Sequence, residues 1–86
     1  MKKSIENTAL LAHAVASRLT MQAGEFLTWR RVSSLDTYRA NEADVVIGPA
    51  GRTWTARFAD GTEIVGCPTV SAAQTAASVL AHMEAL

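Results

Sequence analysis

The dipeptide Asp60-Gly61 is the feature of this sequence that most restricts the fold of the chain. It separates two segments in which apolar and polar residues alternate, and an Asp-Gly pair in that position is typical of a tight β-hairpin. We therefore expect strands over residues 52–59 and 62–67, joined by a two-residue turn. This register places Trp54 opposite Cys67 across the hairpin.

The two faces of the hairpin differ in polarity, because successive side chains of a strand point to opposite sides of a sheet. The apolar face, which we expect to face the core, consists of Trp54, Ala56, Phe58, Val65 and Cys67. A further strand over residues 44–47 is expected to join it through a four-residue turn at 48–51, Gly-Pro-Ala-Gly. That turn places Val45 opposite Trp54 and adds Val45 and Ile47 to the core face. The outer face then consists of Val46, Thr53, Thr55, Arg57 and Ile64.

A helix is expected on each side of this meander. Residues 4–23 carry apolar side chains at helical spacing, with Ser4 as N-cap and Gly24 in the position of the glycine that ends many helices. The predicted buried stripe of this helix consists of Ile5, Ala9, Ala12, Val15, Ala16, Leu19 and Ala23. The second helix begins at Ser71, where Ser-Ala-Ala-Gln fits a capping box. Its predicted stripe consists of Ala73, Ala76, Ala77, Leu80 and Met83.

The segment from Glu25 to Ala43 fits neither the helical nor the strand period. One interpretation is a strand over residues 26–32, a turn at 33–36 and a second extended piece over 37–40. A short helix is the alternative interpretation.

The predicted fold class is therefore α+β, with an N-terminal helix, an antiparallel β-meander of three to four strands, and a C-terminal helix packed on one sheet face. A length of 86 residues indicates a single domain over residues 1–86. The single cysteine, Cys67, indicates a reducing compartment, and no apolar run reaches the roughly 18 residues of a membrane span. We expect a cytoplasmic protein with no membrane contact.

No set of residues predicts catalysis or a metal site. His13 and His82 each lie alone on a predicted helix, and Cys67 has neither a CxxC motif nor a neighbouring base. No carboxylate pair is marked as shielded, and the sequence lacks a phosphate-binding loop. We therefore expect a protein that is not an enzyme and has no cofactor, no metal and no catalytic residue.

Arginines and the outer sheet face are the candidates for partner binding. Arginine beside apolar groups is favoured at interfaces, and the predicted partner-binding residues are Arg30, Arg31, Arg52, Thr55, Arg57 and Ile64. In the alternative, the 26–40 segment or the N-terminal helix covers this face, and its residues belong to the core.

Two resemblances add to this interpretation. Trp54, Gly66, Thr69 and Ala72-Ala73 resemble the pattern of the sheet-plus-helix DNA readers, namely AP2-type domains and the arm-binding domains of phage integrases. That resemblance implies DNA contact through the exposed sheet face, although the face has one arginine and the chain has no net positive charge. The small size, the alanine content and the Val65-Gly66 strand leading into an Ala-rich helix resemble small phage-encoded inhibitors of the anti-CRISPR kind. That resemblance implies occlusion of a bacterial nucleoprotein complex.

The leading hypothesis is a non-enzymatic interaction protein, a phage or mobile-element inhibitor that binds a host protein or nucleoprotein complex such as a CRISPR effector. The alternative is a small DNA-binding module that reads DNA with its exposed sheet face. Both monomer and homodimer stay open, because exposed edge strands can pair across a two-fold axis.

Overall fold

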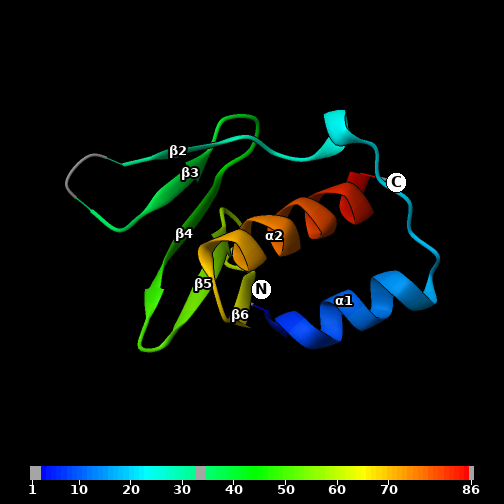
Figure 1. Ribbon diagram of the computed structural model, residues 1–86, viewed down its shortest axis with the longest axis horizontal. Coiled ribbons are helices and arrows are strands. Elements are labelled where there is room, and N and C mark those ends of the chain that lie inside the picture. The colour runs from blue at the N-terminus through cyan, green and yellow to red at the C-terminus, as the bar shows by residue number, and fades with distance from the viewer. Residues whose placement is uncertain (1–2, 33–34, 86) are drawn as a thin grey trace.

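The computed structural model describes residues 3–32 and 35–85. The elements are β1 (Ser4–Glu6), α1 (Asn7–Ala16), the 3-10 turn η1 (Ala23–Glu25), β2 (Trp29–Arg31), β3 (Tyr38–Ala40), β4 (Val45–Ala50), β5 (Thr53–Phe58), β6 (Glu63–Cys67) and α2 (Val70–Ala85). The strands form one mixed sheet in the order β1-β6-β5-β4-β3-β2, and both helices lie on the same side of it (Figure 1). The α+β class is confirmed, but the sheet has six strands rather than three to four.

The N-terminal helix is shorter than predicted at both ends. Ser4 does not cap a helix, because residues 4–6 form β1 and pair in parallel with β6. The helix starts at Asn7 and ends at Ala16. Arg18 then adopts a φ of 53°, and Arg18 N donates to Val15 O while Leu19 N donates to Ala14 O. This is a Schellman motif with arginine where glycine is usual, so Gly24 does not end the helix.

The predicted buried stripe of α1 is wrong. The buried residues are Asn7, Leu10 and Ala14, whereas Val15 is 77% exposed. The helix carries alanines on several of its own faces, so helical spacing alone does not determine which face is buried. Packing against α2 and β6 determines it. In α2 the predicted stripe is confirmed for Ala73, Ala76, Ala77 and Leu80, which are buried, while Met83 is half-buried.

The β5–β6 hairpin turns at Asp60-Gly61 as expected, but its register is shifted by one residue. Phe58 N donates to Thr62 O at 2.8 Å, and Ala56 pairs with Ile64 instead of Val65. Asp60 Oδ1 accepts a hydrogen bond from Thr62 N, and this bond lowers the pKa of the Asp60 carboxyl. Gly61 has a φ of 90°, which glycine tolerates without strain.

A β-bulge in β6 restores the expected pairing of Trp54 with Cys67. Between this pair and the Ala56–Ile64 pair, β6 has two residues, Val65 and Gly66, where β5 has only one. Gly66 has a φ of 75°, in the left-handed region that favours glycine. The extra residue turns both Ile64 and Cys67 into the core, where each has no exposed surface.

The β4–β5 turn has two residues rather than four. Strand β4 continues to Ala50, which pairs with Thr53, and Gly51 has the positive φ of 66° that a type II′ turn requires at its first central position. Val45 therefore lies opposite Phe58, not Trp54. Pro49 lacks a backbone N–H but is tolerated in the strand for two reasons. Its pair with Trp54 is a non-hydrogen-bonded pair of the β4–β5 ladder. On the other side, the β3–β4 ladder ends at Ile47, so no β3 residue lies opposite Pro49.

The segment that fitted neither period folds as a β-hairpin. The strand expected over 26–32 is β2, shortened to Trp29–Arg31, and the extended piece over 37–40 is β3. The alternative of a short helix is wrong for this part, although η1 forms just before it. The turn predicted at 33–36 lies partly outside the described residues.

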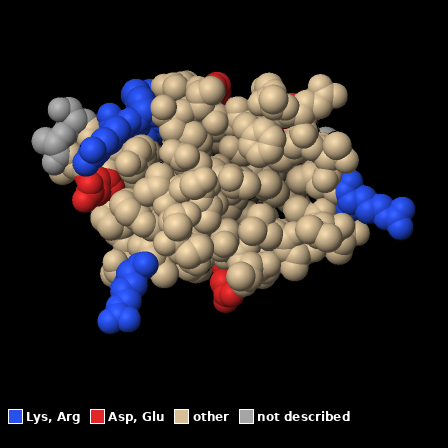
Figure 2. All heavy atoms as spheres, in the orientation of Figure 1, with Lys and Arg blue, Asp and Glu red and all other residues tan. Residues whose placement is uncertain are grey.

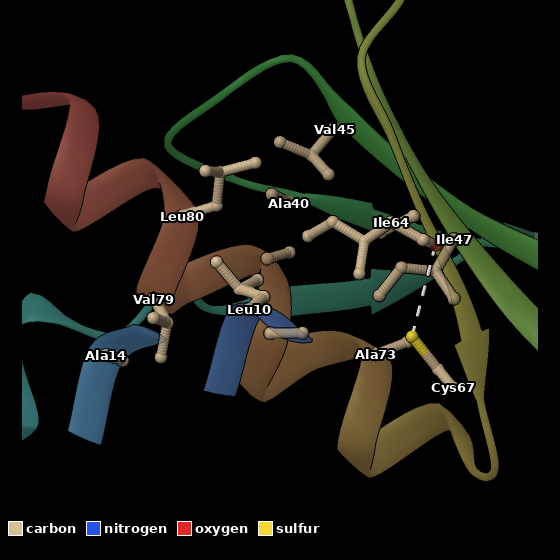
Figure 3. Close-up of a cluster of buried hydrophobic side chains, with 13 residues drawn as sticks. Leu10, Ala14, Ala40, Val45, Ile47, Ile64, Cys67, Ala73, Val79 and Leu80 are labelled. Carbon is tan, nitrogen blue, oxygen red and sulfur yellow. Dashed lines mark hydrogen bonds between the residues drawn. The ribbon is translucent and has the colours of Figure 1, made fainter. Parts of the chain in front are cut away.

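The core lies between the sheet and the two helices (Figure 3). Val45, Ile47, Ile64 and Cys67 point from the strands toward Leu10 of α1 and toward α2, which supplies the remaining buried contacts. Tyr38 and Trp54 pack edge to face on this same side, with ring centroids 6.5 Å apart. Because both helices cover one face, the opposite face carries no helix of the described chain.

Candidate functional site

The helix-free face of the sheet carries a row of arginines. Direct cross-strand pairing aligns Arg30 with Arg39, Arg39 with Val46, and Val46 with Arg57. All four residues point away from the core, because Ala40, Ile47 and Ala56, which alternate with them, are buried. We call Arg30, Arg39, Val46 and Arg57 the arginine row. It crosses four strands and spans about 14 Å, given the usual spacing between strands.

A hollow of about 250 Å³ lies beside the row on the same face. It is lined by Val46, Thr55, Arg57, Thr37 and the β4 residues Gly48, Pro49 and Ala50. Arg57 is the one ionisable side chain in this lining, and its guanidinium offers N–H donors but no acceptor. The hollow can therefore hold an anionic or hydrogen-bonding group beside apolar surface, but it offers no group for proton transfer.

The arginines of the row are exposed and have polar partners, of which Asp44 is exposed and Glu63 is buried. Arg57 Nη2 lies 3.4 Å from Glu63 Oε2, and Arg39 Nη1 lies 3.9 Å from Asp44 Oδ1. Arg30 Nη1 donates to Asn41 Oδ1 at 2.9 Å. An exposed pair such as Arg39–Asp44 contributes about 0–1 kcal/mol, so the Arg39 guanidinium can exchange Asp44 for a group of a ligand.

The structure brings together only half of the predicted partner-binding residues. Arg30, Thr55 and Arg57 lie on the helix-free face. Arg31 points to the other face at the β2–β3 hairpin, where its Nη2 lies 3.0 Å from Asp36 Oδ1. Arg52 lies in the turn between β4 and β5.

Ile64 does not belong to the outer face, contrary to the prediction. It is fully buried, because the hairpin register is shifted by one residue and directs it inward. Val65, which was predicted to be in the core, alternates to the other side and is half-buried. The alternative in which the 26–40 segment or the N-terminal helix covers the outer face is also wrong, since β2 and β3 extend the sheet edge and α1 packs on the core side.

Arg39 lies in the middle of the row and was not among the predicted partner-binding residues. The in-out-in pattern of Tyr38, Arg39 and Ala40 could have placed it on the face opposite the core. Its neighbours become known only once β3 is paired with both β2 and β4, and that pairing is not encoded in local spacing.

Cys67 and His82 make contacts within the fold. Cys67 is buried with its Sγ 4.0 Å from Ile64 O, and desolvation raises the pKa of its thiol. His82 Nδ1 lies 2.8 Å from Glu25 Oε2, which ties η1 to α2. Within residues 3–32 and 35–85, no three His, Cys, Asp or Glu side chains gather in a way that could hold a metal ion.

In the view of Figure 2, charged side chains project at the margins of the molecule and the area over α2 is uncharged. Among the described helices, none combines the length and apolar character needed to cross a membrane.

Comparison with protein-family models, with curated proteins and with solved structures finds no match. The geometry of the helix-free face is therefore the basis for an assignment of function.

Proposed function

We propose that this protein is a non-enzymatic interaction protein that binds a partner protein through the helix-free face of its sheet. The observation that carries the proposal is the arginine row. Arg30 and Arg39 face each other directly across two strands, and like charges in that arrangement destabilise a sheet. Placing these two charges opposite each other does not stabilise the sheet, so a role in binding accounts for their arrangement better than a role in stability.

The composition of the face supports a protein partner. Val46 lies between two arginines, and the hollow beside it adds threonine hydroxyls and the apolar surface of Ala50. Arginine next to apolar surface in a concave patch is the combination that interface hot spots favour. We include in the proposal a cytoplasmic setting and a role as a phage or mobile-element inhibitor that occludes a host nucleoprotein complex.

DNA binding is the second candidate, because the same row could contact phosphates. Two observations weaken it. Tyr38, Trp29 and Trp54 pack on the core side, so no described aromatic ring of the sheet offers a stacking surface on the helix-free face. Glu63 and Asp44 lie beside the arginines, and the net charge of the chain is zero.

The test uses the charge-reversing substitution Arg39→Glu. It replaces a like-charge pair with an opposite-charge pair facing Arg30 and loses the exposed contact of Arg39 with Asp44, so the melting temperature should change little. Arg18→Glu, at the end of α1, is the matched control with the same change in net charge. In affinity capture from a bacterial lysate, we expect wild type and the Arg18→Glu variant to retain a bacterial protein that the Arg39→Glu variant does not retain.

Titration with duplex DNA at increasing salt separates the two candidates. A DNA-binding module should lose affinity steeply with salt, since each phosphate contact releases a counterion. If folded wild type and the folded Arg39→Glu variant capture the bacterial protein equally, the arginine row is not the binding site.

A further inference from the structure

Among the described strands, β2 forms one edge of the sheet and pairs with β3 alone. Asn41 N donates to Thr28 O, and Val32 N donates to Thr37 O, at 2.9 and 2.8 Å. Hydrogen-bonded positions alternate along an antiparallel ladder, so Arg30 also directs its backbone groups toward β3. Trp29 and Arg31 then direct their N–H and C=O groups toward the open edge.

The two sides of this edge present different chemistry. On the helix-free face, Arg30 stands at the end of the arginine row, next to Arg39. On the helix face, Trp29 borders a hollow of about 170 Å³. The rest of that lining consists of Phe26, Leu27, Ser71, Gln74, Thr75 and Ser78. A strand added beyond β2 would point alternate side chains at Arg30 and into this hollow.

We propose that β2 accepts an extended segment of the partner as a seventh strand. A carboxylate of that segment lies opposite Arg30, and an apolar side chain on its other face fills the hollow beside Trp29. The inference rests on the proposed function, since it names the chemistry of the partner that the arginine row binds. Backbone hydrogen bonds from Trp29 and Arg31 supply affinity, and the two side-chain contacts supply specificity.

Charge complementarity selects this occupant over a second copy of the chain. Antiparallel pairing of two β2 edges about Arg30 would place that arginine opposite its own copy, which like-charge repulsion disfavours. An acidic segment instead forms an opposite-charge pair at the same position, where the close spacing of a non-hydrogen-bonded pair favours contact.

The experiment uses a synthetic nine-residue peptide in which valine and glutamate alternate, and a control peptide with lysine in place of glutamate. Hydrogen exchange followed by NMR reads the amides of Trp29 and Arg31. We expect the glutamate peptide to protect both amides and the lysine peptide to protect neither. Arg30→Glu should lower the affinity of the protein for the glutamate peptide by about tenfold or more, because an attractive cross-strand charge pair becomes repulsive. The remote Arg18→Glu control should leave binding unchanged.

Arg31→Pro provides a second variant, because proline removes the outward N–H at that position without removing a bond to β3. It should abolish peptide binding, whereas Arg31→Ala should retain it. Protection elsewhere in the sheet, equal binding of both peptides, or a dimer that protects Trp29 without peptide would overturn strand addition. If strand addition is overturned while the Arg39→Glu variant still fails to capture the bacterial protein, binding through the helix-free face stands. If the Arg39→Glu variant captures that protein like wild type, both proposals fail.

Discussion

Ile64 and Cys67 are three residues apart in β6, and both are fully buried. Strict alternation would send one of them to the outside, so their burial depends on the bulge between them. Ile64 is thus a core residue whose side is set by backbone irregularity rather than by sequence period.

We predict that Ile64→Ala lowers the free energy of unfolding by about 2–4 kcal/mol, as is usual for removing a buried isoleucine side chain. Val65→Ala, at the half-buried neighbouring position, should cost less than about 1 kcal/mol. Urea denaturation measures both. A larger loss for Val65→Ala would show that the hairpin has the register of a two-residue turn.

Arg18 is the one described residue other than glycine with a positive φ, at 53°. This conformation strains a side chain with a Cβ atom, and glycine relieves the strain at the end of a helix. We predict that Arg18→Gly raises the free energy of unfolding by about 0.5–1 kcal/mol. Arg18→Ala removes the same charge and should give no gain, so equal stabilisation by both variants would contradict the backbone explanation.

The Cys67 thiol is buried, and desolvation raises its pKa above that of an exposed thiol. The unfolded chain therefore releases this proton at lower pH than the folded chain. Stability contributed by the neutral thiol is present below about pH 8.5 and is lost as the pH rises toward the folded pKa. Urea denaturation from pH 7.5 to 10 should show a steeper decline for wild type than for Cys67→Ala. Parallel declines would contradict this assignment.

At the scale of single elements, the bulge in β6 depends on Gly66, whose φ is 75°. We predict that Gly66→Ala lowers the free energy of unfolding by about 1–2 kcal/mol, because alanine is strained in the left-handed region. Gly48→Ala in β4 is the matched control, since its backbone is not left-handed and no heavy atom lies within 4 Å of the added Cβ. Equal effects on the melting temperature would show that the bulge does not require glycine.

The element most readable from the sequence was the β5–β6 hairpin, because Asp60-Gly61 acts locally and the alternation on both sides is regular. Its exact register was not readable. Asp60 bonds to Thr62 N and lengthens the turn, and Gly66 then corrects the offset. The longer turn and the bulge shift the register in opposite directions, so Trp54 lies opposite Cys67 as predicted. Ile64, which lies between the turn and the bulge, faces the core instead of the outside.

Long-range pairing explains what the sequence could not show. Ser4–Glu6 reads as the first turn of a helix, yet it forms a strand because it finds β6 across more than fifty residues of chain. The β4 strand continues through Gly48 and Pro49, which usually break strands, since its neighbour β3 is too short to demand a hydrogen bond there. Of the candidate site, Arg30, Thr55 and Arg57 were predicted, whereas Arg39 required knowledge of β3 pairing.

At the scale of the whole molecule, both helices pack on one side and leave a six-stranded face without a helical cover. The core lies between the sheet and that single layer of helices, so the helix-free face lies outside the core. The arginine row gives this face a charge pattern that the fold does not require, and the open edge of β2 extends it.

The central claim is that the partner binds the arginine row, and the affinity of the captured partner for Arg39→Glu tests it most directly. Isothermal titration calorimetry should compare wild type, Arg39→Glu and the Arg18→Glu control, each checked for an unchanged melting temperature. The account predicts that Arg39→Glu weakens binding by about tenfold or more, as for a charge at an interface hot spot, while Arg18→Glu binds like wild type. Wild-type affinity for Arg39→Glu, or an equal loss in both variants, would contradict it.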